Sequence, residues 1–122
     1  MNTEPTVFSK IIARELPAEI VFESETIIVI NNLYPLTPIH LLAISKKPYR
    51  DIDELLQSTN QDDKDLLWEL FTTLSHIAHE RGIDASGYRL TTNIGKGGGQ
   101  SIPHLHVHLL GGMNLGEESL AK

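Results

Sequence analysis

The sequence predicts an α+β fold with a roughly five-stranded antiparallel sheet, one long helix and one short helix. Segments rich in β-branched residues cluster before and after a single long helical pattern, and their connections are of hairpin length. Short connections favour antiparallel neighbours, and the alternating strand–helix order of a βαβ repeat does not fit. With 122 residues the chain has the size of one domain. We therefore expect a single domain over residues 1–122, with a core at about 7–112 and a C-terminal tail at 113–122.

The first half of the chain is expected to hold a short helix and three strands. Apolar residues at positions 7, 8, 11 and 12 have the spacing of an amphipathic helix within residues 6–15, which Leu16-Pro17 ends. A hairpin is predicted next, with strands at 20–23 and 26–30. A loop at 31–38 precedes a mostly buried strand at 40–45. Residues 49–58 are expected to form a short helix and a connection.

One long helix, predicted over residues 61–81, dominates the second half. Asn60 can cap its first turn, and Gly82 suits the position just after its end. Trp68 lies off the apolar stripe of this helix, so it is expected at the flank of the core or in a partner contact. Two further strands are predicted at 88–93 and 104–110. The stripe consists of Leu66, Leu67, Leu70, Phe71, Leu74, Ile77 and Ala78.

Composition and charge exclude several classes of function. The chain has no cysteine, which removes disulfides, thiolate nucleophiles and Cys-based zinc sites. A formal net charge of −6 argues against a general attraction to nucleic acid or to anionic lipid. The N-terminus lacks the pattern of a signal peptide, and no apolar stretch is long enough to span a membrane. We therefore expect a cytoplasmic protein with no nucleic-acid or membrane partner.

Three of the six histidines alternate within five positions, at His104, His106 and His108. Successive side chains of a strand point to opposite faces, so the three imidazoles are expected on one face. The apolar residues between and after them, such as Leu105 and Val107, would then pack on the core. A lone buried histidine usually has only a structural role, but three in alternation favour a functional site.

Two chemistries fit such a face. Metal binding would use two neighbouring histidines plus a further ligand such as His40 or Asp65. The outer two lie roughly 13 Å apart at about 3.3 Å per residue, so all three cannot hold one ion. Alternatively, neutral imidazole can attack phosphorus without a separate base. His106 has a histidine on each side, which makes it the natural nucleophile.

A glycine-rich segment over residues 93–101 precedes the three histidines. It holds four of the nine glycines, and glycine lets backbone N–H groups approach an anion closely. Asn93 and Ser101 add neutral donors at its ends. No helix is expected after this segment, so it is not the phosphate-binding loop of nucleoside triphosphatases. Joined to the histidines, it favours a phosphate-binding site.

At these residues the sequence resembles the histidine triad family, and most of all its histidine triad nucleotide-binding, HINT-like, branch. The motif is His-x-His-x-His followed by apolar residues, found here at 104–110. Supporting segments lie at 8–12, 16–18, 38–40, 98–101 and 111–112, so the resemblance covers about residues 7–112. It implies the fold of that family, with the sheet continued across a homodimer. It further implies a hydrolase that binds purine nucleotides and cleaves at the α-phosphate of nucleoside phosphoramidates or related conjugates, without a cofactor or a metal.

The resemblance also implies residue roles. His106 would attack phosphorus and carry the nucleotidyl group, His108 would hold the phosphate, and His40 would support the triad. The implied catalytic residues are His106, His104, His108, Ser101 and His40. The implied substrate-binding residues are Asn32, Leu33, Asn93, Gly99, Gln100, Ser101, His106, His108, Phe8, Ile11, Val7 and Ile30.

The sequence departs from the HINT-like pattern at three places and leaves alternatives open. Residues 44–48, Ile-Ser-Lys-Lys-Pro, differ from the usual Ile-Pro-Lys-x-His form. Asn32 stands where these proteins usually carry Asp beside the ribose, so an acceptor remains and a donor is added. The tail at 113–122 does not match the ending of well-known members, so the sequence does not define the leaving group. The alternatives to a hydrolase are a non-catalytic dimeric nucleotide-binding or sensor module and, third, a histidine-based metalloprotein.

Overall fold

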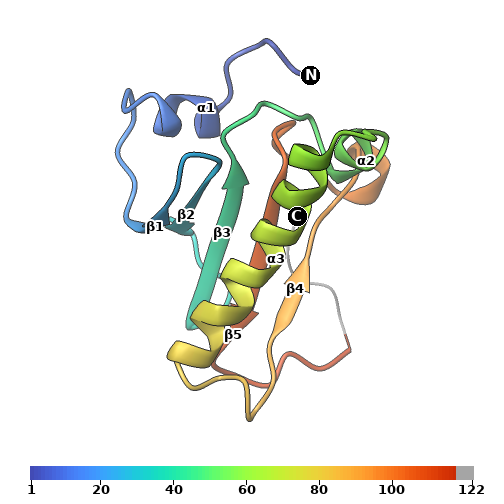
Figure 1. Ribbon diagram of the computed structural model, residues 1–122. Helices are drawn as coiled ribbons and strands as arrows, with labels where there is room; N and C mark the ends of the chain where they lie inside the picture. Colours follow the sequence, from blue (N-terminus) through green and yellow to red (C-terminus); the bar gives the residue numbers. More distant parts are fainter. Residues whose placement is uncertain (118–122) are drawn as a thin grey trace.

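Five strands form one antiparallel sheet in the order β1-β2-β3-β5-β4, as Figure 1 shows. The computed structural model describes residues 1–117. The strands are β1 (Ile20–Glu23), β2 (Ile27–Asn31), β3 (Ile39–Ser45), β4 (Arg89–Thr91) and β5 (His106–Gly111). The helices are α1 (Val7–Ile12), α2 (Ile52–Leu56) and α3 (Gln61–Glu80), with a 3₁₀ turn η1 at Lys96–Gly98. The predicted α+β class and antiparallel sheet are confirmed.

The sheet has two buried faces, each with its own apolar cluster. One face packs against α3, where Leu41, Val107 and Leu109 meet Leu70 and Leu74. The other lies under α1, and its cluster consists of Phe8, Ile11, Ile28, Ile30, Leu42 and Ile44. Because strand residues alternate between faces, β5 presents Val107 and Leu109 to α3 and its histidines to the α1 side. The histidines of β5 therefore lie on the α1 side of the sheet, which carries the smaller of the two apolar clusters.

The long helix α3 follows its sequence signals closely. Oδ1 of Asn60 accepts the backbone N–H of Asp62 at 2.7 Å and caps the first turn. The helix ends at Glu80, and Gly82 just beyond it has a φ of +73°, a left-handed conformation that glycine adopts readily. Trp68 is 73% exposed, as its position off the apolar stripe predicted. No helix of residues 1–117 is long and apolar enough to cross a membrane.

A buried carboxylate joins α3 to the segment after β3, and the sequence did not signal it. Asp63 is buried and accepts hydrogen bonds from Tyr49 Oη at 2.6 Å, Ser58 Oγ at 2.7 Å and Lys47 Nζ at 3.1 Å. The Tyr49 bond is the largest of the effects that lower the pKa of Asp63. An aspartate in a first helical turn is usually a solvated charge that complements the helix dipole. Here it holds α3 in place.

The helix α1 is short but is tied to its surroundings at both ends. Thr6 and Ser9 form a reciprocal capping box at its start. Beyond its end, Arg14 adopts a φ of +65°, and its guanidinium pairs with Glu23 of β1. Glu23 also forms a salt bridge with Lys46 at 2.8 Å. Because Arg14 follows α1 and Glu23 belongs to β1, their ion pair joins the end of α1 to the sheet. These contacts position the apolar side chains of α1 over the sheet.

Several element boundaries differ from the prediction. β5 begins at His106, two residues later than predicted, because His104 N–H turns back to the Ile102 carbonyl at 2.8 Å. β4 spans three residues, which is shorter than predicted, and the glycine-rich segment contains the turn η1. The short helix expected within 49–58 is α2, so residues 1–117 hold two short α-helices and one long one.

Candidate active site

A groove with a volume of about 760 Å³ opens on the α1 side of the sheet. Its floor comes from β2, β3 and β5, one wall from α1 with residues 16–19, and the other from the loop that follows β2. Ten of the predicted site residues line it, namely Val7, Phe8, Ile11, Ile30, Asn32, Leu33, His40, Ser101, His106 and His108. Segments as distant in the chain as α1 and β5 therefore meet at one cavity.

Asn93, Gly99, Gln100 and His104, the other four predicted residues, lie outside the groove lining. Gln100 is occupied by the protein, because its Oε1 accepts Gly95 N–H and its Nε2 donates to the carbonyls of Arg50 and Ile102. Its side chain therefore holds the glycine-rich segment in place by hydrogen bonds and does not line the groove. Asn93 Nδ2 donates to the Gly98 carbonyl at 2.9 Å, while its buried Oδ1 has no hydrogen-bond donor among residues 1–117.

The hydrogen bond on one ring nitrogen defines which tautomer the neutral imidazole of His106 adopts. Its Nδ1 lies 2.7 Å from the carbonyl oxygen of His104, and a carbonyl can only accept. The proton of the neutral imidazole is therefore on Nδ1, and Nε2 carries a lone pair. The Phe8 ring packs edge-on against this imidazole with the ring centres 4.8 Å apart. The ring of His106 is thus held in one orientation and one tautomer.

A second chain of hydrogen bonds runs through His40 to His108. The backbone N–H of Leu36 donates to Nδ1 of His40 at 3.1 Å, so the His40 proton is on Nε2. That Nε2 donates to Nδ1 of His108 at 2.9 Å, which leaves the His108 proton on its own Nε2. Burial lowers the pKa of His40 below its ordinary value, which keeps its imidazole neutral. The site thus pairs a nucleophilic nitrogen on His106 with a donor on His108.

His104 differs from the other two triad histidines. Its Nε2 donates to the Ser45 carbonyl at 2.6 Å, and the Thr6 hydroxyl lies 3.5 Å from its Nδ1. The ring is buried beside Phe8, on the same side of the sheet as α1 but away from the groove lining. Burial lowers the pKa of His104, and the bond to Ser45 opposes that shift. Its carbonyl, rather than its ring, reaches His106.

The amide of Asn32 is oriented by its neighbours at the edge of the groove. Its Oδ1 accepts the Tyr34 backbone N–H at 3.1 Å, and its Nδ2 lies 3.2 Å from Nε2 of His40. The amide thus lies beside the His40–His108 pair, at the start of the loop that forms one wall.

Among residues 1–117 no group of three or more His, Asp or Glu side chains is arranged to hold a metal ion.

Comparisons with known proteins identify the family of this chain. A family model described as scavenger mRNA decapping enzyme C-term binding matches residues 5–119. Purine nucleoside phosphoramidase of Escherichia coli is 35% identical over 113 residues, which are 93% of this chain and 92% of that relative. A structure titled HIT family hydrolase from Clostridium thermocellum superposes with a TM-score of 0.84 at 38% identity, covering 98% of this chain and all of the other. The chain belongs to the histidine triad family.

A further relative of this histidine triad protein is adenylylsulfatase HINT1 of Arabidopsis thaliana. It is 37% identical over 114 residues, covering 93% of this chain and 76% of the relative. The fold predicted from the triad motif is therefore confirmed by sequence relatives and by structure.

Sequence reasoning missed several groove residues of this histidine triad protein. Leu42 of β3 and Ile102 before β5 complete the apolar surface, and Tyr34 and Pro35 extend the loop wall. Leu42 could have been found, because it is two residues from His40 in a predicted strand and shares its face. Tyr34 and Pro35 carry no such signal, since loop residues have no periodicity.

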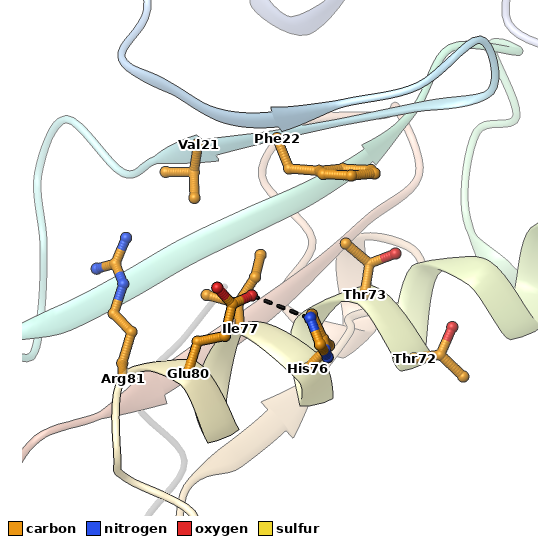
Figure 2. A pocket seen from close by; sticks show the side chains of 8 residues that line it. All are labelled: Val21, Phe22, Thr72, Thr73, His76, Ile77, Glu80 and Arg81. Atoms are coloured by element: carbon orange, nitrogen blue, oxygen red, sulfur yellow. Dashed lines mark ion pairs between the residues drawn. The ribbon is translucent and has the colours of Figure 1, made fainter.

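A second hollow of this protein lies on the opposite face of the sheet, between β1 and α3. Figure 2 shows Val21 and Phe22 of β1 above Ile77 and the exposed side of α3, with an ion pair between His76 and Glu80 at 3.2 Å. None of the triad residues lines it. The side chains of His76 and His79 on α3 are both exposed.

Proposed function

We propose that this chain is a purine nucleotide hydrolase that cleaves nucleotide conjugates such as nucleoside phosphoramidates at the α-phosphate, through a nucleotidyl group on His106. The observation that carries the proposal is the tautomer of His106, whose Nδ1–H is held by the His104 carbonyl at 2.7 Å. This bond leaves the Nε2 lone pair as the nucleophile in a groove large enough for a nucleotide. The names of two relatives, purine nucleoside phosphoramidase and adenylylsulfatase, support a nucleotide conjugate as substrate.

The first step forms a bond between His106 Nε2 and phosphorus and breaks the bond from phosphorus to the leaving nitrogen. The imidazole keeps its Nδ1 proton and becomes cationic, and the His104 carbonyl stabilises that charge. Nε2–H of His108 would donate to a phosphate oxygen as negative charge develops there. Ser101, which lines the same groove, is the candidate donor of a proton to the departing amine.

The second step returns the enzyme to its starting form. Water attacks phosphorus, the bond to His106 Nε2 breaks, and a nucleoside monophosphate leaves with one oxygen from water. The proton released by water offsets the one given to the amine, so the sum is conjugate plus water to monophosphate plus amine. No metal or cofactor enters this scheme.

The nucleoside would lie along the groove from the histidines toward α1. Phe8, Ile11 and Ile30 offer an apolar surface for the base, and Asn32 offers an amide to the ribose hydroxyls. A carboxylate in place of Asn32, 3.2 Å from His40, would favour a charged imidazole there.

The test is release of AMP from an adenosine phosphoramidate by the wild type, by His106→Ala and by the surface control His76→Ala. We expect His106→Ala to lose nearly all activity and His76→Ala to keep it. Mass spectrometry of the quenched wild-type reaction should find an AMP adduct on His106. Full activity of His106→Ala would refute the mechanism. Tight nucleotide binding by a wild type that does not turn over would instead favour the binding or sensor module.

The homodimer implied by the family resemblance belongs to the same proposal. Sedimentation or light scattering of the purified chain should give twice the mass of 13.6 kDa. A monomer at micromolar concentration with full activity would remove the dimer from the proposal without affecting the chemistry.

A further inference from the structure

Two large, mainly apolar side chains that line the groove are exposed to solvent. Leu33 is 81% exposed and Tyr34 is 80% exposed, and both line the groove. An exposed apolar cluster beside a cavity usually marks a binding surface, because it gains nothing for the fold. Tyr34 has no role in the chemistry proposed above.

Hydrogen bonds to two site residues, Asn32 and His40, hold the backbone around Tyr34. Oδ1 of Asn32 accepts the Tyr34 N–H at 3.1 Å, and the Leu36 N–H donates to His40 at 3.1 Å. The loop is thus anchored on both sides of Tyr34 by residues of the site. An aromatic side chain on an ordered loop loses little entropy when it binds a ligand, because only two side-chain torsions become fixed.

The position of Tyr34 along the groove fits the base of a nucleotide rather than its phosphate. The phosphate would lie at His106 and His108 on β5, and Asn32 is two residues before Tyr34 in the loop wall. The opposite wall is α1, whose Phe8 and Ile11 are buried and apolar. A base that enters between the two walls meets α1 on one face and the loop on the other.

We propose that Tyr34 is a nucleobase-binding residue that stacks on the base and favours purines over pyrimidines. The inference rests on the proposed function, since it requires a nucleotide in the groove. Stacking of an aromatic side chain on a base is independent of its hydrogen-bonding pattern but grows with ring area. The two fused rings of a purine therefore gain more from Tyr34 than the single ring of a pyrimidine.

The experiment measures the binding of AMP and CMP by calorimetry to the wild type, Tyr34→Leu, Tyr34→Phe and Trp68→Leu. Trp68→Leu is the matched control, because it removes an exposed aromatic ring from α3, outside the groove. We expect Tyr34→Leu to weaken AMP binding about tenfold, equivalent to about 1.4 kcal/mol, and CMP binding about threefold or less. Tyr34→Phe should bind like the wild type, since the ring is retained.

A spectroscopic measurement separates stacking from a change in the loop. The fluorescence of the etheno-adenine analogue of AMP, which is quenched by stacking, should recover in bound Tyr34→Leu but not in bound Tyr34→Phe. Equal AMP affinity and equal quenching in wild type and Tyr34→Leu would overturn the role of Tyr34 and leave the proposed function intact. A wild type that binds neither nucleotide would overturn both. A change of oligomeric state in Tyr34→Leu, with AMP affinity unchanged, would assign Tyr34 to a contact between chains instead.

Discussion

Replacing His40 tests the hydrogen-bond chain that fixes the tautomer of His108. In His40→Leu the backbone N–H of Leu36 loses its acceptor and Nδ1 of His108 loses its donor. The proton of His108 can then move to Nδ1, and the donor to the phosphate is lost. A hydrogen bond to a charged group contributes about 1.5–3 kcal/mol. If that bond acts only in the transition state, kcat should fall about 10- to 150-fold.

The same change should lower stability by an amount that the structure predicts separately. His40 is buried, but its bond with the Leu36 N–H is only part-buried, so the loss should lie at or below the roughly 1–3 kcal/mol that a fully buried unpaired donor costs. His40→Gln is the matched variant, because its amide oxygen can accept from Leu36 and its amide N–H can donate to His108. We expect His40→Gln to recover most of the activity that His40→Leu loses.

The assay is single-turnover release of AMP from an adenosine phosphoramidate, with thermal melts of each variant measured alongside. A folded His40→Leu with the kcat of the wild type would refute the role of this hydrogen-bond chain. Equal losses in His40→Leu and His40→Gln would show that the imidazole acts through its charge or shape instead.

Three further predictions concern stability and metal dependence. Leu105→Ala should destabilise the chain by about 2–5 kcal/mol in urea unfolding, because Leu105 is fully buried against the α3 side; a change below about 1 kcal/mol would contradict that packing. Burial lowers the pKa of His104 from its ordinary 6.5, so the unfolded chain binds more protons below that pH. The free energy of unfolding should thus be highest above about pH 6.5 and decrease as the pH falls through the lowered pKa of folded His104. The dependence on pH should be weaker in His104→Gln. A urea midpoint of the wild type that does not change with pH would contradict this prediction. Dialysis against a chelator should leave AMP release unchanged, and loss of activity that zinc restores would revive the metal hypothesis.

Local patterns determined most of the fold. The alternation of apolar residues and histidines at 104–109 predicted which side chains face the core, and Leu105, Val107 and Leu109 are fully buried against α3. The apolar spacing over 61–80 predicted α3, and Asn60 predicted its start. Such patterns are readable because strand and helix periods follow from backbone geometry alone, whatever the rest of the chain does.

Contacts between distant segments were decided only by the tertiary structure. His40 and His108 are 68 positions apart, and nothing in either segment indicates that Nε2 of one would donate to Nδ1 of the other. His104 shares the periodicity of the triad, yet the turn at Ile102 and the packing of α1 bury its ring away from the groove. The sequence by itself therefore determined the elements and the chemistry of the imidazoles, because both depend on residue type and spacing. The tautomers, the walls of the groove and the place of Tyr34 depend on how separate segments pack, which spacing along one segment does not encode.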